Sequence, residues 1–139
     1  MSINNNYNVV VGEYARRHFM KRFEKKHKWV WNQTFSVIEN MLIRINWLLL
    51  STKAEEIHKF KNCRIIKCEF KIVWSNSSAK TWWNRIIVSV NDETNECKIL
   101  LIYSKTDVVW SHETVWWEQE IINNYYEIKE YFKKINYIL

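Results

Sequence analysis

The stretch NRIIVSVNDETNECKILLIYSKTD, residues 84–107, decides the fold of this chain. Its two apolar runs, Ile86 to Val90 and Ile99 to Tyr103, are short and rich in β-branched residues, as strands are. The polar segment NDETNE between them has the composition of a turn. The stretch therefore predicts an antiparallel β-hairpin, in which Arg85 at the start of one strand meets Tyr103 to Lys105 at the end of the other.

Helical spacing of apolar residues dominates the N-terminal part of the chain. A short strand is predicted over Tyr7 to Val11, and Gly12 ends it. Glu13 to Lys28 follows as a very basic helix with a narrow apolar stripe. Asn32 or Thr34 is the expected cap of a second helix. The apolar stripe of this second helix predicts a core face made of Phe35, Ile38, Met41, Leu42, Ile45, Leu48 and Leu49.

The rest of the chain alternates between strand and helix signals. One further helical turn is expected around Ala54 to His58, and a strand over Cys63 to Trp74. Glu113 to Asn124 predicts a short helix. Residues 125–139 repeat apolar side chains at helical spacing, which predicts an amphipathic C-terminal helix that acts as a lid on the core or as a partner-binding arm. The expected fold class is therefore α+β.

Length and charge limit the possible partners. A chain of 139 residues is expected to form one domain over residues 1–139, with residues 1–8 disordered. The formal net charge of +6 is compatible with RNA, DNA, the ribosome or an acidic protein as partner. The densest basic run lies in the first predicted helix: Arg16, Arg17, Lys21, Arg22, Lys25, Lys26 and Lys28. A solvated helix face is the simpler interpretation of such a run.

Several classes of protein are disfavoured by the sequence. No apolar stretch reaches the roughly 18 residues of a membrane span, and the start MSINNNYN resembles no secretion signal. We therefore expect a cytoplasmic protein with no membrane partner. Cys63, Cys68 and Cys97 form no CxxC pair and have no histidine at ligand spacing. Buried reduced thiols are expected, and neither a metal nor a cofactor is predicted.

The tryptophan content is anomalous. The chain has 9 Trp but 1 Gly and 0 Pro, whereas average usage would give roughly ten glycines. Abundant Asn, Lys, Ile and Tyr indicate an AT-rich gene, which disfavours the UGG codon of tryptophan. Some bacterial lineages read UGA as Trp and others as Gly, so Trp74, Trp83 and Trp110, in turn-like surroundings, are candidates for glycine. By contrast, Trp31 and Trp117 have amphipathic surroundings typical of core anchors.

The order of these elements and the local text resemble the RelE/ParE superfamily of toxins from bacterial type II toxin–antitoxin systems. The resemblance covers about residues 9–125 and rests on RRHFMKRFEKKHK, CRIIKCEFKI, NRIIVSV, ETVWWEQEIINNYY and above all KILLIYSKTD. It implies a RelE-like fold: two N-terminal helices packed on a curved antiparallel sheet of three to four strands, with a C-terminal helix.

The resemblance also implies a chemistry. Ribosome-dependent members cut mRNA in the ribosomal A site without a metal, by attack of the ribose 2′-hydroxyl on the adjacent phosphate. By position, Arg85 matches the phosphate clamp of the family and Lys105 a second cation. Lys71, and less securely Lys67, match lysines of which one can act as the base. Tyr103 or His112 is the candidate proton donor or base-stacking group.

The same resemblance leaves other readings open. Arg16, Arg17, Arg22 and Lys25 of the basic helix, together with Lys67, are the expected RNA-binding residues. The expected partners are mRNA in the ribosomal A site and an antitoxin protein whose extended acidic segment covers the basic sheet. A ParE-like inhibitor of DNA gyrase is the alternative function, and an inactive toxin-fold binding protein is a third. Arg85 can also be a structural residue paired with Asp107, and both Asp107 and Glu69 bring negative charge to the proposed phosphate site.

Overall fold

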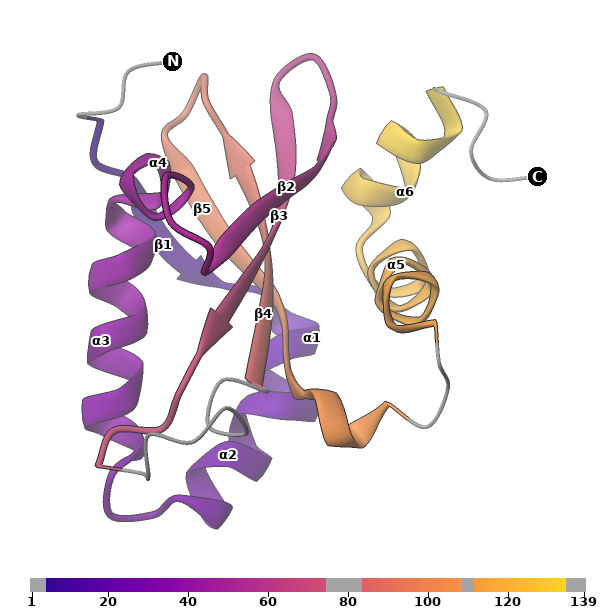
Figure 1. Ribbon diagram of the computed structural model, residues 1–139. Coiled ribbons are helices and arrows are strands. Elements are labelled where there is room, and N and C mark those ends of the chain that lie inside the picture. The colour runs from indigo at the N-terminus through magenta and orange to yellow at the C-terminus, as the bar shows by residue number, and fades with distance from the viewer. Residues whose placement is uncertain (1–4, 75–83, 109–111, 135–139) are drawn as a thin grey trace.

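The computed structural model describes residues 5–74, 84–108 and 112–134 (Figure 1). It is an α+β fold with one five-stranded sheet in the order β1-β5-β4-β3-β2. The elements follow in this order: β1 Asn8–Val11, α1 Glu13–Ala15, the π-helical turn η1 Arg16–Met20, α2 Lys21–Lys26, α3 Trp31–Ile43, α4 Ile45–Leu48, β2 Ala54–Lys59, β3 Cys63–Phe70, β4 Asn84–Asn91, β5 Glu96–Ser104, the 3-10 turn η3 Lys105–Asp107, α5 Glu113–Asn124 and α6 Tyr126–Lys134.

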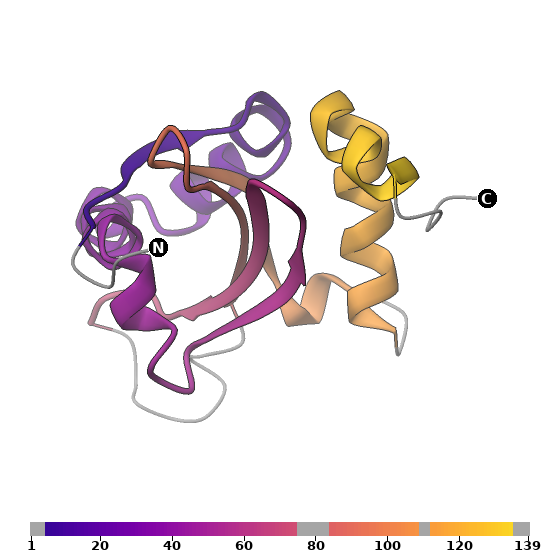
Figure 2. The same ribbon diagram turned by 90° about the horizontal axis from the view of Figure 1, so that it is seen from above.

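Helices cover the sheet on both sides. The sheet bends around the N-terminal helices, and α5 and α6 lie against its other side (Figure 2). The three central strands are almost wholly buried, because their side chains face a helical layer on either side. The buried apolar side chains form a single cluster that includes strand residues together with Trp31, Leu42, Trp117 and Phe132. None of the described helices is long and apolar enough to span a membrane.

The predicted hairpin is confirmed. β4 and β5 pair antiparallel, with Arg85 opposite Tyr103 and Asn84 opposite Ser104. The register shifts between Ile87 and Val88, so the ladder is irregular in its middle and regular at the end that carries Arg85. This end of the sheet, where β4 begins and β5 ends, is called the rim below.

The sheet is larger than predicted and is not purely antiparallel. β1 pairs with β5 in parallel, which gives five strands instead of three or four. The helical turn expected around Ala54 to His58 is wrong, because this segment is the edge strand β2, paired with β3 through a bulge. Its local composition favours a helix only weakly, and the ladder of hydrogen bonds offered by the open edge of β3 outweighs that preference.

The helical predictions hold in outline and differ at their ends. The first helix contains a π-helical stretch over η1, and Ala15, Phe19 and Phe23 are its buried stripe. The caps predicted for the second helix are wrong: α3 begins at Trp31, and its cap position makes no side-chain hydrogen bond. Of the C-terminal helix expected over 125–139, the structure describes α6; residues 135–139 lie outside the described part.

One end of the sheet, far from the rim, is closed by a buried arginine. The Arg64 side chain of β3 is 1% exposed. It donates from Nε to Asp92 Oδ2 at 2.9 Å and from Nη2 to Asp92 Oδ1 at 3.0 Å, and Nη2 also reaches the Tyr7 hydroxyl at 3.3 Å. Tyr7 is itself buried and donates to Asp92 at 2.6 Å. The expectation that residues 1–8 are disordered therefore fails at Tyr7, which this network holds in place.

The C-terminal helices dock through carboxylates as well as apolar contacts. Glu118 of α5 contacts His58 of β2, and Glu127 of α6 accepts from Lys98 of β5 at 3.1 Å. Tyr125, between the two helices, donates its hydroxyl to the Leu100 carbonyl at 2.8 Å and accepts from the Ala15 backbone N–H at 3.1 Å. Beside it stands Gly12, where an added Cβ would lie 2.4 Å from the Tyr125 hydroxyl. A side chain at position 12 is therefore excluded by this anchor.

Two groups of tryptophans behave differently. Trp31 and Trp117 are 2% and 0% exposed, which confirms them as core anchors. Trp74 is 78% exposed and has a φ of 63°, in the left-handed region that favours glycine. Its backbone is thus of the kind that the glycine hypothesis requires, while Trp83 and Trp110 lie outside the described residues.

Candidate functional site

A row of three polar side chains crosses the sheet at the rim. Glu69 of β3 lies opposite Arg85 of β4, and Arg85 lies opposite Tyr103 of β5. Residues paired across neighbouring strands point to the same face of a sheet, so the three share one face. That face is the one covered by α5, as the contacts of Glu113 show. The Arg85 Nη2 is 3.7 Å from a Glu69 carboxylate oxygen.

Glu113, at the start of α5, lies over this row. Its Oε2 accepts a hydrogen bond from the Tyr103 hydroxyl at 2.7 Å and lies 3.7 Å from Arg85 Nε. Trp116, one turn further along α5, packs edge-on against the Tyr103 ring with centroids 4.9 Å apart. The helix thus places a carboxylate beside both Arg85 and Tyr103, and a tryptophan ring against Tyr103.

Burial follows from this cover. Arg85 is 8% exposed and Tyr103 is 0% exposed. Burial, followed by the hydrogen bond to Glu113 and the charge of that carboxylate, raises the pKa of Tyr103 well above its usual value. The phenol is therefore held in its protonated form, as a hydrogen-bond donor rather than as a source of protons.

An open pocket lies directly beside Glu113 on the same face. It has a volume of about 330 Å³ and is lined by Lys67, Lys105, His112, Glu113, Thr114 and Val115. Lys67 comes from β3, Lys105 from η3 and His112 from the segment just before α5, so three distant stretches of chain converge. We call it the lysine pocket. Three of the residues predicted for catalysis or RNA binding meet there.

The structure places two residues of the expected site differently from Lys67 and Lys105. Lys71 lies beyond the last residue of β3 and is not among the residues that line the lysine pocket, whereas Lys67 is. The predicted pairing of Arg85 with Asp107 is replaced by contacts of Arg85 with Glu69 and Glu113. Asp107 instead accepts from the Ser104 backbone N–H at 3.3 Å and completes the cap of η3. The expected negative charge of Glu69 near Arg85 is confirmed.

The basic residues of the first helix are exposed but do not act as one group. Arg17 pairs with Glu13 at 2.7 Å along the same helix. Arg16 and Lys25 are exposed, and Arg22 reaches a separate pocket described next. Of the four residues of the first helix that were predicted to bind RNA, Arg22 is the one that lies against the rim.

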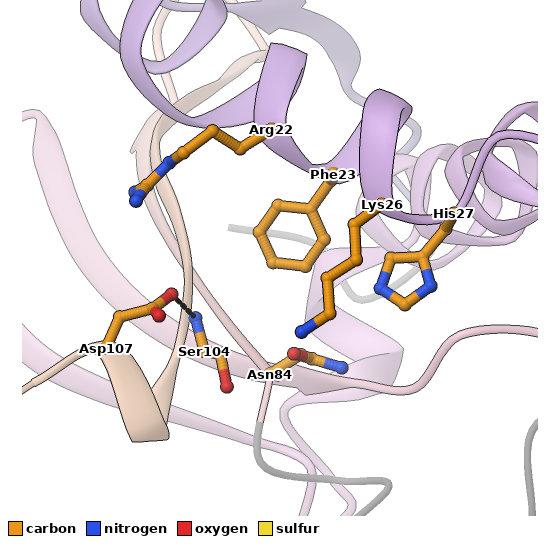
Figure 3. A pocket seen from close by; sticks show the side chains of 7 residues that line it. All are labelled: Arg22, Phe23, Lys26, His27, Asn84, Ser104 and Asp107. Atoms are coloured by element: carbon orange, nitrogen blue, oxygen red, sulfur yellow. Dashed lines mark hydrogen bonds between the residues drawn. The ribbon is translucent and has the colours of Figure 1, made fainter.

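The second pocket opens on the other side of the rim, under α2 (Figure 3). Its volume is about 130 Å³, and it is lined by Arg22, Phe23, Lys26, His27, Asn84, Ser104 and Asp107. Asn84 and Ser104 precede and follow Arg85 and Tyr103 in their strands, so they point to the opposite face. We call it the α2 pocket. η3 separates it from the lysine pocket, since Lys105 lines one pocket and Asp107 the other.

Sequence reasoning missed Glu113, Lys26 and His27 at these sites. Glu113 carries an ordinary signal, an acid in the first turn of a helix. Nothing in the local sequence shows that this turn lies over Arg85, because the position of α5 depends on the packing of Trp117 and Ile121 against the sheet.

The cysteines are buried free thiols. Burial raises the pKa of Cys63 and of Cys97 to about 12, and that of Cys68 well above its usual value. Such thiols are not nucleophiles near neutral pH. Within the ranges that the structure describes, no three His, Cys, Asp or Glu side chains gather in a way that could hold a metal ion.

Comparison with known proteins gives a likeness of fold. No family model matches the sequence, and neither does any curated protein. Among solved structures, a chain of the archaeal RelE–RelB complex from Pyrococcus horikoshii OT3 matches with a TM-score of 0.51 and 14% sequence identity. The match covers 74% of the present chain and 99% of that one. The fold of this protein is therefore RelE-like.

Proposed function

We propose that this chain is the toxin of a type II toxin–antitoxin pair and that it cleaves mRNA in the ribosomal A site. The observation that carries the proposal is the meeting of Lys67, Lys105 and His112 in one pocket, beside Arg85 and Tyr103, on a RelE-like sheet. Phosphodiester cleavage by a neighbouring hydroxyl needs cations at the phosphate, a base and an acid. These side chains supply all three.

Exposure and contacts support the following roles. Lys67 takes the proton from the ribose 2′-hydroxyl, whose oxygen then bonds to phosphorus. Arg85 and Lys105 stabilise the charge that develops on the phosphate. The bond from phosphorus to the 5′-oxygen breaks, and His112 donates a proton to that oxygen. Tyr103 donates its one hydroxyl proton to Glu113 and so holds that carboxylate beside Arg85. The products are a 2′,3′-cyclic phosphate and a 5′-hydroxyl end.

The partner of this toxin is an antitoxin protein with an acidic segment. The basic lysine pocket and the net charge of +6 favour binding of such a segment. Expression of the chain alone is expected to arrest growth, and the neighbouring reading frame should relieve the arrest. Harmless expression of correctly folded chain would contradict the proposal.

A translation reaction programmed with one mRNA tests the catalytic roles, with cut sites mapped by primer extension. Arg85→Ala should lower cleavage roughly 100- to 1,000-fold, as loss of a charge-stabilising group does. Lys67→Gln should lower it roughly 100-fold or more through loss of the base. Lys71→Gln is the matched control outside the pocket and should keep cleavage close to wild type. The roles are wrong if Lys71→Gln is the more damaging of the two lysine variants.

One observation favours a second candidate, a toxin-fold protein that binds without cleaving. Glu69 and Glu113 both lie at 3.7 Å from Arg85, and the guanidinium is largely covered. Under this reading the acids are permanent partners of Arg85. Intact mRNA in the translation reaction, together with stable binding of the antitoxin, would support it; accumulation of cleaved DNA with intact mRNA would instead support the gyrase alternative.

A further inference from the structure

The α2 pocket carries two positive charges without ionic partners. Among the residues that the structure describes, neither Arg22 nor Lys26 makes an ion pair, although Arg17 of the same helix pairs with Glu13. Arg22 and Lys26 stand four residues apart, so they lie on one face of α2 and repel each other. The Arg22 guanidinium lies over the Phe19 ring, 5.2 Å from its centroid. Two like charges held together in this way are stabilised by an anion.

The remaining walls of the pocket offer neutral hydrogen-bonding groups. The Asn84 amide and the Ser104 hydroxyl lie across from α2, and Lys26 points toward Asn84 (Figure 3). Burial, followed by the charge of Lys26, lowers the pKa of His27, so the imidazole is neutral at physiological pH and can donate one hydrogen bond. Asp107 is the one acid among the lining residues, and its Oδ2 already accepts from the Ser104 N–H.

Size selects a small anionic group. At about 130 Å³ the pocket is smaller than the roughly 300 Å³ at which sites for drug-sized ligands begin. A single phosphate group fits this volume, and its oxygens match the guanidinium, ammonium and amide donors around it.

Position selects the source of that phosphate. The pocket shares the rim with the lysine pocket, and only η3 lies between them. Arg22, Lys26, Lys105 and Lys67 therefore form one curved series of cations around the ends of β4 and β5. A single nucleic acid strand follows such a series with its backbone, one phosphate to each cationic group.

We propose that the α2 pocket binds a phosphate of the same RNA strand that is cleaved at the lysine pocket, on a nucleotide next to the cleaved one. This rests on the proposed function for the identity of the strand. The pocket is a positioning site, in which Arg22 and Lys26 hold the phosphate and Asn84 and Ser104 add hydrogen bonds. It takes no part in the chemical step.

The test is the binding of a 2′-O-methyl RNA of about eight nucleotides, which cannot be cleaved, measured by fluorescence anisotropy at several salt concentrations. The Arg22→Gln/Lys26→Gln double variant should bind roughly tenfold more weakly, and its slope of log affinity against log salt should fall by about 0.7. The Lys21→Gln/Lys28→Gln variant removes the same number of charges from exposed positions of the same basic segment outside the pocket. It should lose much less affinity.

A variant that binds RNA more tightly than wild type excludes misfolding as the cause of the change. Asp107→Asn removes the acid of the pocket and should tighten RNA binding and raise the salt slope. Inorganic phosphate and a mononucleotide serve as competitors and should displace the RNA only at far higher concentrations, because they meet one pocket alone. Equal losses in the two double variants, or a mononucleotide that competes as well as the RNA, would overturn the proposal.

The two proposals can fail separately. If wild-type protein binds the RNA through Arg22 and Lys26 but leaves mRNA intact in the translation reaction, the cleavage function fails and the phosphate pocket stands. If wild-type protein cleaves mRNA and the Arg22→Gln/Lys26→Gln variant cleaves and binds equally well, the phosphate pocket fails and the cleavage function stands.

Discussion

Two buried arginines on neighbouring strands use the same side chain in different ways. Arg64 is 1% exposed and makes hydrogen bonds of 2.9 and 3.0 Å to Asp92, the residue that directly follows β4. Arg85 is 8% exposed, and its carboxylate neighbours lie at 3.7 Å. One of these neighbours belongs to α5, a separate element. The difference indicates that Asp92 locks Arg64 in place, whereas the two carboxylates nearest Arg85 are held at a longer distance.

The largest expected effect lies at the locked arginine. Arg64→Met removes the ionic partner of the partly buried Asp92 carboxylate, and the free energy of unfolding should fall by about 3 kcal/mol. Arg85→Met should cost only about 1 kcal/mol, because its ion pairs with Glu69 and Glu113 are longer than the contacts of Arg64 with Asp92. Urea unfolding of both variants measures the contrast. Equal losses in the two variants would remove the distinction between the arginines.

Acid should lower the stability of the fold through the pair of Arg64 with Asp92. Burial alone would raise the pKa of Asp92, but the hydrogen bonds from Arg64 and Tyr7 and the charge of Arg64 outweigh it and lower that pKa. A carboxyl whose pKa is lower in the folded state adds stability above its unfolded pKa of about 3.9 and loses it as pH falls through the folded value. Unfolding between pH 6 and pH 2 should therefore show a loss that Asp92→Asn lacks. Glu93→Gln, at the exposed neighbour, is the control and should keep the loss.

At the rim, removing the charge of Glu113 beside Arg85 should change the activity. Glu113→Gln keeps an acceptor for the Tyr103 hydroxyl and removes the charge beside Arg85. We expect mRNA cleavage to rise severalfold, with a loss of less than about 1 kcal/mol in stability. Unchanged or reduced cleavage would mean that Glu113 is a fixed part of the site. Glu120→Gln, further along α5, is the control.

The smallest effect is expected in the segment that leads from β3 toward Arg85. Trp74 has a φ of 63°, which costs a residue with a side chain about 1 kcal/mol or more. Trp74→Gly should therefore raise the free energy of unfolding by roughly 1 kcal/mol without altering the contrast between the arginines. A UGA codon at position 74 would agree with this result, and a UGG codon would end the glycine hypothesis there.

The sequence predicts the pairing of the two hairpin strands better than it predicts which elements pack on them. The meeting of Arg85 with Tyr103 follows from turn composition and strand length alone, and the structure confirms it. The strand β2 was not predictable from its own residues, because the edge of β3 imposes it. The parallel pairing of β1 with β5 depends equally on contacts between distant segments.

The candidate site divides along the same line. Tyr103 belongs to the hairpin and Lys105 directly follows it, so their place at the rim follows from the register of the hairpin. The choice of Lys67 over Lys71 needs the actual end of β3, which local composition does not mark. Glu113 and the α2 pocket depend on how α5 and α2 lie on the sheet, so no local pattern reveals them.

The hydrogen bonds of Tyr125 fix the C-terminal end of α5 against the sheet. The Tyr125 hydroxyl is held by the backbone of Leu100 and Ala15, and it fits there because Gly12 beside it has no side chain. Glu113 stands 12 residues away, about 18 Å along a helix. Between these two points Trp117 and Ile121 are buried against the sheet, so the helix carries the position set at Tyr125 through to Glu113 over Arg85. A single glycine far from the rim thereby helps to set where Glu113 lies over Arg85.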